Sequence, residues 1–179
     1  MTSGRPKSTS RDTIAEAACE LFLERGYEHT SAAAIARRAG VSRSSFFNYF
    51  DSKAAVLWGG FDERADAAVS ALAAGTEPAA ALRALVTGFA PDSLALAVTN
   101  SDVMGIAAQL EDERALRQAR LARAIAERLI AGGASRLAAE VRAAGAAATV
   151  FAAVWAWARS GSARTSLLDA FDEASAALA

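Results

Sequence analysis

The feature that most constrains this chain is a short stretch near its beginning, residues 30–53, which reads TSAAAIARRAGVSRSSFFNYFDSK. Gly40 can adopt the left-handed conformation that ends one helix, and Ser42 can accept a hydrogen bond from the first turn of the next. An aromatic cluster follows, and then a new segment that opens with Lys53. Two short helices joined by such a turn predict a helix-turn-helix.

Composition and periodicity predict an all-α fold. The chain has 49 alanines and only three prolines among 179 residues, with little β-branched alternation. Apolar residues recur at helical spacing between Gly and Pro breaks, which predicts a three-helix head and a helical body, about nine helices in all. The expected helices cover residues 10–25, 31–39, 42–49, 52–72, 78–89, 103–110, 111–130, 135–159 and 165–178.

Charge separates two parts of the chain. Residues 1–53 carry eight Lys and Arg against six Asp and Glu, a balance of +2, whereas residues 54–179 carry 11 against 14, a balance of −3. We therefore expect a DNA-binding domain over 1–53, including an N-terminal arm with Gly4-Arg5-Pro6-Lys7, followed by a separate helical body over 54–179. Such an arm resembles segments that lay arginine in a minor groove, or it is a non-specific basic tail.

Several classes of protein are disfavoured by what the chain lacks. Cys19 is the only cysteine and His29 the only histidine, so we expect no disulfide, no metal site and no cofactor. No His–carboxylate or Cys–His set is evident for a base or nucleophile, so we expect no enzyme. No signal peptide opens the chain and no apolar run reaches roughly 18 residues, so a cytoplasmic protein without a membrane partner is expected.

An array of positions between Ile14 and Leu57 resembles the DNA-binding domain of the TetR family of bacterial repressors. A lone Ala-Gly-Val-Ser would mean little, but here many positions match together. The resemblance implies a repressor that binds double-stranded DNA as a homodimer and is released from a palindromic operator by a small-molecule effector. The matching positions are Ala17-Ala18, Leu21-Phe22, Gly26-Tyr27, Thr30-Ser31, Ile35-Ala36, Ala39-Gly40-Val41-Ser42, Tyr49-Phe50 and Ser52-Lys53.

The resemblance implies roles in DNA binding for individual residues. Arg43 is the best candidate to read guanine, because its guanidinium matches the O6 and N7 acceptors of that base. Phe46 either packs inward or touches a thymine methyl group, and Lys53 would neutralise a phosphate. Ser44 and Ser45 would face base edges, Asn48 and Tyr49 would contact phosphate or sugar, and Thr30, Ser31 and Arg38 would clamp the DNA backbone. The chain departs from the commoner family pattern at Ser44-Ser45, where Gly-Thr is frequent, and at Phe47, where tyrosine is frequent.

The body is expected to supply the dimer interface and the effector pocket. In the family the last two helices pair with their copies, and Trp155 and Trp157 lie two residues apart on one of them, so we expect at least one to meet a partner or the pocket. The composition suggests an apolar effector, and residues 58–62 resemble regulators of the mycofactocin system, whose effectors are fatty-acyl thioesters. The expected pocket residues are Trp58, Phe61, Leu85, Phe89, Met104, Ile106, Gln109, Leu121 and Ile125, and the expected interface residues are Phe151, Val154, Trp155, Leu167, Leu168 and Phe171.

Two alternatives to an effector-controlled repressor stay open. The same head would serve a DNA-binding activator or architectural regulator without an effector, and such a protein would bind DNA without being released by any small molecule. A helical interaction module that has lost DNA binding is disfavoured, because Arg43, Asn48, Tyr49 and Lys53 are all present.

Overall fold

The computed structural model describes residues 10–161 and 164–178, and over this part of the chain the protein is all-helical. The expected basic arm, residues 1–9, lies outside the described residues. Ten α-helices and one 3₁₀ helix are present in the described part. They are α1 (Ser10–Arg25), α2 (Ala32–Arg38), α3 (Arg43–Tyr49), η1 (Ala55–Trp58), α4 (Gly59–Ala73), α5 (Pro78–Val86), α6 (Ser93–Thr99), α7 (Ser101–Met104), α8 (Ala107–Ala131), α9 (Arg136–Gly161) and α10 (Leu167–Ala176).

The helix count differs from the expected nine for an identifiable reason. Residues 93–99 form a helix of their own, because the Asp92 carboxylate accepts hydrogen bonds from the backbone N–H groups of Leu94 and Ala95 and so caps it. The expected helix over 52–72 is divided, since its first turn is the 3₁₀ helix η1 and the α-helix begins at Gly59. The expected helix over 103–110 is wrong, because Gly105 adopts the left-handed conformation (φ 62°) and ends α7, while residues 107–110 are the first turn of α8. The remaining expected helices are present, with ends that shift by a few residues.

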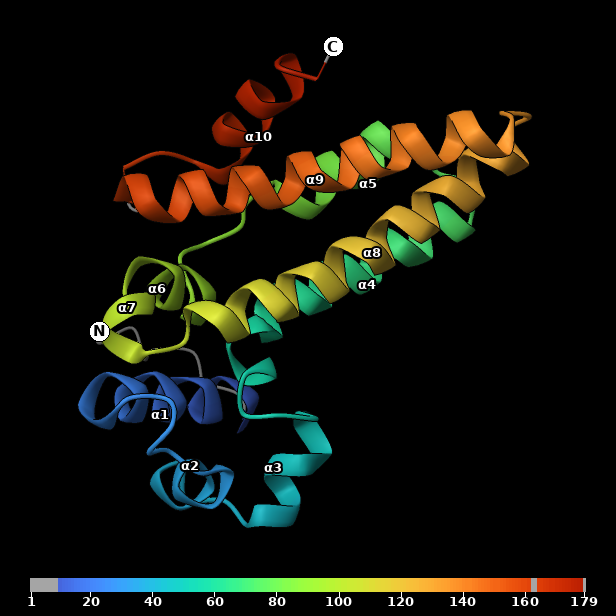
Figure 1. Ribbon diagram of the computed structural model, residues 1–179. Helices are drawn as coiled ribbons and strands as arrows, with labels where there is room; N and C mark the ends of the chain where they lie inside the picture. Colours follow the sequence, from blue (N-terminus) through green and yellow to red (C-terminus); the bar gives the residue numbers. More distant parts are fainter. Residues whose placement is uncertain (1–9, 162–163, 179) are drawn as a thin grey trace, which may run out of the picture.

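The three N-terminal helices form a head at one end of the molecule. Helices α1, α2 and α3 lie together below the body in Figure 1. In the turn between α2 and α3, Gly40 has φ of 71°, the left-handed conformation predicted for it. Ser31 and Ser42 cap α2 and α3 with their hydroxyl groups. The predicted helix-turn-helix is thus formed by local interactions that the sequence itself specifies.

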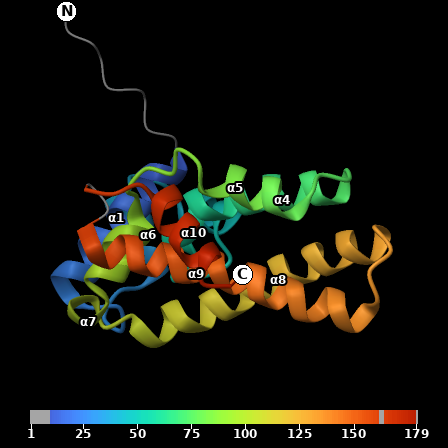
Figure 2. The ribbon, with the colours of Figure 1, turned by 90° about the horizontal axis from the view of Figure 1, so that it is seen from above.

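The body consists of long helices packed over an aromatic core. Helices α8 and α9 form an antiparallel hairpin, which is seen in both views (Figures 1 and 2). Helix α4 packs against α5 and α8, and α10 lies against α9. The Trp58 ring lies 5.7 Å from Phe61, 6.3 Å from Phe151 and 5.9 Å from Trp155, measured between ring centroids. This cluster joins the start of α4 to the last half of α9.

Trp155 and Trp157, at least one of which was expected to meet a partner or the pocket, are both buried within the protomer. Trp155 packs on Trp58, whereas Trp157 packs on Phe89 and donates its indole N–H to the carbonyl of Thr165 at 3.0 Å. Helix α9 has neighbours around most of its circumference, namely α8, α10 and α6. Residues that point in different directions on this helix are therefore both covered.

Helix α9 is also long and apolar enough to cross a membrane by length and composition alone, with a mean hydropathy of 1.5 over its most apolar window. Arg142 and Arg159 stand at either end of the uncharged part of this helix. In the described structure α9 instead supplies buried side chains to the protein core, among them Val150, Phe151 and Val154.

Candidate nucleic-acid interface

One face of α3 presents four side chains to solvent. Arg43, Ser44, Phe47 and Asn48 are exposed, and they stand one and four residues apart, which places them together on a helix. The guanidinium of Arg43 lies 5.6 Å from the centre of the Phe47 ring. This face combines a forked donor, a hydroxyl, an amide and an apolar ring. These are the groups that read base edges in a major groove.

The two roles that the sequence suggested for Phe46, inward packing and contact with a thymine methyl group, fall to two different residues. Phe46 has no exposed surface and packs against Phe50 with ring centroids 5.9 Å apart, so in this structure its side chain is not available to a thymine methyl group. Phe47 is 45% exposed and can make that contact. The signal that identifies Phe47 is its spacing of four from Arg43, whereas Phe46 is spaced by four from the buried Phe50.

Serine hydroxyls surround the start of α3. Ser42 accepts a hydrogen bond from the backbone N–H of Ser45 at 3.0 Å, and its hydroxyl lies 2.8 Å from those of both Ser44 and Ser45. Ser44 is exposed and Ser45 half-buried, so both are close to the outer face of the helix. Ser31 is exposed and caps α2 by accepting from Ala34.

Thr30 and Arg38, two residues expected to contact the DNA backbone, form polar contacts within the head. The Thr30 side chain is buried, and its hydroxyl donates to the carbonyls of Gly26 at 2.9 Å and Leu21 at 3.3 Å. Arg38 forms ion pairs with Glu20 and Glu24, and these hydrogen bonds lower the pKa of Glu24 from its ordinary value. Thr30 therefore stabilises the turn before α2, and the charge of Arg38 is largely neutralised by α1.

The Lys53 ammonium forms hydrogen bonds within the head but can still bind a DNA phosphate. Its ammonium donates to the carbonyls of Tyr27 at 2.8 Å and Thr30 at 3.1 Å, and it lies 3.7 Å from the centre of the Tyr27 ring. An ammonium has three N–H donors, so two hydrogen bonds leave one for a phosphate. Asn48 and Tyr49 are both exposed near the end of α3, as contact with the DNA backbone requires.

The expected effector-pocket residues are mostly buried in the protein core. Trp58, Phe61, Leu85, Met104 and Leu121 are almost completely buried. Phe89 and Ile106 are also buried, Gln109 is half-buried, and Ile125 borders a cavity of about 570 Å³ between α5, α8, α9 and α10. The described residues contain no group of three or more His, Cys, Asp and Glu that could hold a metal ion.

The expected interface residues also pack inside the protomer. Phe151 and Val154 are fully buried, and Trp155, Leu167 and Phe171 nearly so, while Leu168 is half-buried. The exposed apolar residues of α9 lie on a different line, at Leu137 (74% exposed) and Val141 (65%). The outward-facing residues of α9 are therefore not the ones that the sequence analysis named.

The N-terminal part of the chain, which contains the head, is similar to known bacterial regulators. Residues 14–57 match the model of bacterial regulatory proteins of the tetR family. Over 58 residues the chain is 43% identical to a protein described as the mycofactocin biosynthesis transcriptional regulator MftR of Mycobacterium tuberculosis. That match covers 32% of this chain and only 29% of the relative, so it relates the two proteins over less than a third of their lengths.

Solved structures of regulators share the whole fold. NalD, the secondary repressor of the MexAB-OprM multidrug efflux pump in Pseudomonas aeruginosa, is 17% identical with a TM-score of 0.53, and the alignment covers 94% of each chain. The fatty acid degradation regulator FadR of Bacillus halodurans is 20% identical with a TM-score of 0.50, over 97% of this chain and 96% of that one. At these identities the likeness shows the fold alone.

Replacing Arg43 by Ala tests whether its guanidinium recognises a guanine in the DNA site. We expect the Arg43→Ala variant to lose discrimination at one position of the DNA site, at a cost of about 1–3 kcal/mol for the preferred base. Binding of DNA duplexes that differ at single positions would measure this, with Arg37→Ala, an exposed cation on α2, as the matched control. An unchanged base preference would remove Arg43 from the reading face.

Replacing Lys53 by Met tests both of its roles. Loss of two charge-assisted hydrogen bonds should lower the free energy of unfolding by about 1–3 kcal/mol, measured by urea denaturation. If the third donor binds phosphate, the slope of log affinity against log salt should fall by about 0.9 per head. The expected result is a change in both quantities. Reduced stability with an identical salt slope would make Lys53 a purely structural residue.

Proposed function

We propose that this chain is a regulator of the TetR family, namely a sequence-specific transcriptional repressor that acts as a homodimer on a palindromic operator. The match of residues 14–57 to the tetR family model supports this proposal. The observation that carries this proposal is the exposed face of α3, with Arg43, Ser44, Phe47 and Asn48. The head of residues 1–53 would bind DNA, and the body of residues 54–179 would dimerise and respond to an effector. A protein with this role acts in the cytoplasm, where bacterial DNA lies.

Dimerisation follows from the small size of the reading helix. Helix α3 has only seven residues, so one head reads few base pairs. Two heads related by two-fold symmetry read two half-sites about 34–36 Å apart, one turn of the double helix, which multiplies specificity. The operator of such a dimer is an inverted repeat.

The outward face of α9 supports dimerisation with a second copy of this chain. Leu137, Val141, Ala144 and Ala152 are exposed, and their spacing of three, four or eight places them along one line of the helix. The half-buried Ala148 continues that line. Small side chains let two helices approach closely, and an apolar line of this length is what a helical dimer buries.

We propose a small, apolar effector for the body. The cavity of about 570 Å³ between α5, α8, α9 and α10 supports this, because Leu82, Ile125, Leu129 and Phe171 contribute to its lining. Its volume lies within the ordinary range for ligand pockets, about 300–1,000 Å³. An effector that binds the body more tightly in one arrangement of the heads shifts the population toward it, and so changes DNA affinity.

Selection of bound duplexes from a random DNA pool, at a stated salt concentration, tests the proposed function. Recovery of an inverted repeat with half-sites one helical turn apart is the expected result. Recovery of nothing above background would contradict sequence-specific binding, and recovery of single half-sites would contradict a dimer. Once an operator is known, release by apolar compounds distinguishes this repressor from an activator or architectural regulator without an effector.

Replacing Leu137 by Glu tests the proposed dimer face. Two carboxylates buried at a two-fold interface are costly, so we expect the dimer dissociation constant of Leu137→Glu to rise by about a hundredfold or more. Sedimentation equilibrium would measure it, and Glu140→Gln, a neighbouring exposed position off the apolar line, is the matched control. A Leu137→Glu variant that stays dimeric at the same concentrations would place the interface elsewhere.

A further inference from the structure

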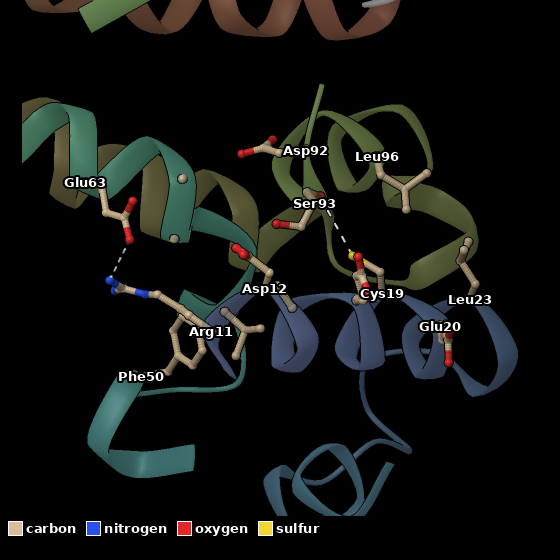
Figure 3. Close-up of a pocket in the computed structure, with 15 residues that line it drawn as sticks. Arg11, Asp12, Cys19, Glu20, Leu23, Phe50, Glu63, Asp92, Ser93 and Leu96 are labelled. Atoms are coloured by element: carbon tan, nitrogen blue, oxygen red, sulfur yellow. Dashed lines mark hydrogen bonds and ion pairs between the residues drawn. The ribbon is translucent and has the colours of Figure 1, made fainter. Parts of the chain in front are cut away.

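A second large cavity lies where the head meets the body. Its volume is about 680 Å³, and it is lined on one side by α1 and on the other by the start of α4 and the start of α6. Figure 3 shows Arg11 and Glu63 at one end, Cys19, Glu20 and Leu23 toward the other, and Asp92 above. Elements far apart in the sequence therefore enclose a space of the size that ligands occupy.

Asp92 places a carboxylate against this space. One of its oxygens caps α6, by accepting from the N–H groups of Leu94 at 3.0 Å and Ala95 at 3.3 Å. The other, Oδ2, faces α4 at Gly60, where a Cβ atom would lie only 2.7 Å away, so glycine is needed for the carboxylate to approach. Burial raises the pKa of Asp92 to about 6, against the opposing effects of backbone hydrogen bonds and Arg64. Above that pH a partly desolvated negative charge faces the cavity.

Carboxylates outnumber cations around this cavity, whose walls, among the described residues, include Glu16, Glu20, Glu63 and Asp92 but only one basic residue, Arg11. Burial, together with the charges of Asp92, Glu16 and Glu20, raises the pKa of the Cys19 thiol to about 12. Cys19 is itself a wall of the cavity, and its Sγ lies 4.0 Å from the carbonyl of Ser93. Burial disfavours any charge at this point, but the nearby carboxylates of Asp92, Glu16 and Glu20 also disfavour a thiolate, and the same charges attract a cation.

Arg11 adds an unused donor at the other end. Its Nη1 pairs with Glu63 at 3.2 Å, and its guanidinium stacks 5.2 Å from the centre of the Phe50 ring. Its Nε atom is buried and has no hydrogen-bond partner among the described residues. A buried N–H without an acceptor is costly, and an oxygen of a bound molecule would relieve that cost.

We propose that this junction cavity binds an organic amine that also carries an oxygen acceptor. The ammonium pairs with Asp92, the oxygen accepts from Nε of Arg11, and the hydrocarbon between them lies against Ala15, Val56 and Leu96. Because the walls belong to both the head and the body, an occupant connects α1 to α4 and α6. The amine is then an effector of DNA binding, a consequence that rests on the proposed function, whereas the binding itself does not.

Isothermal titration with 6-amino-1-hexanol tests this site, with hexanoic acid and 1-hexanol as probes of the same chain length. We expect the amino alcohol to bind the full-length protein and the other two not to bind. Asp92→Asn should weaken amine binding by roughly tenfold or more, because the charge partner is lost. Asparagine is a good N-cap, so this variant keeps α6. Asp102→Asn, an exposed acid at α7, removes the same charge elsewhere and should bind as the wild type does.

A second variant fills the cavity rather than changing its charge. Gly60→Ala brings a methyl group against Asp92 Oδ2 and should also abolish amine binding, while circular dichroism reports whether the helices are retained. Equal binding by Asp92→Asn and wild type, binding of hexanoic acid as tightly as the amine, or no binding of the amino alcohol would each overturn the proposal.

The same titration followed by operator binding separates this proposal from the proposed function. Amine binding that shifts operator affinity supports both. Amine binding without any such shift keeps the site and removes its role as an effector site. Intact operator binding without amine binding overturns the site alone, and loss of all specific DNA binding overturns the proposed function alone.

Discussion

The packing of Trp58 is the interaction on which the arrangement of the molecule depends. Its ring is fully buried at the start of α4, where it contacts Phe61, Phe151 and Trp155. The Arg117 guanidinium of α8 covers it at 4.5 Å, and this cation is held in place by Asp62 at 2.6 and 2.7 Å and by Glu113. One aromatic side chain thus fixes α4, α8 and α9 relative to one another. An aromatic ring of this size contributes a large buried apolar area and a preferred geometry with its neighbours.

Short polar contacts then connect this core to the head. The hydroxyl of Ser52, just before η1, donates to Glu113 of α8 at 3.2 Å, and Glu113 in turn pairs with Arg117. On the other side of the head, the backbone N–H of Tyr27 donates to the carbonyl of Met104 at 2.7 Å. These hydrogen bonds and ion pairs therefore connect the surroundings of Trp58 to the start of α4 and to the turn between α1 and α2. These contacts are the physical basis for any control of the heads by the body.

The junction cavity and the aromatic core lie on opposite sides of this connection. The core contains apolar rings with little free space, whereas the cavity contains carboxylates, a glycine pair and an unused Arg11 donor. The amine proposed for the junction cavity and the apolar effector proposed for the cavity between α5, α8, α9 and α10 would bind at separate places, because the two cavities share no lining residue. Ser93, which donates its hydroxyl to the Leu57 carbonyl at 3.2 Å, ties one wall of the cavity to η1 and hence to the neighbourhood of Trp58.

The sequence by itself determined the helical class, the helix-turn-helix and most helix boundaries, because these depend on local spacing, caps and breakers such as Ser31, Gly40 and Ser42. It did not determine which of two adjacent side chains faces inward, as Phe46 and Phe47 illustrate, nor the inward and outward faces of the alanine-rich α9. When nearly every face of a helix is apolar, as in the alanine-rich α9, the sequence pattern does not indicate which face is buried. Only the tertiary structure decided that Trp155 and Trp157 are both covered, that Thr30 and Arg38 have partners in the head, and that Asp92 approaches Gly60 to make a cavity. These outcomes depend on contacts between residues distant in the chain, which local sequence does not specify.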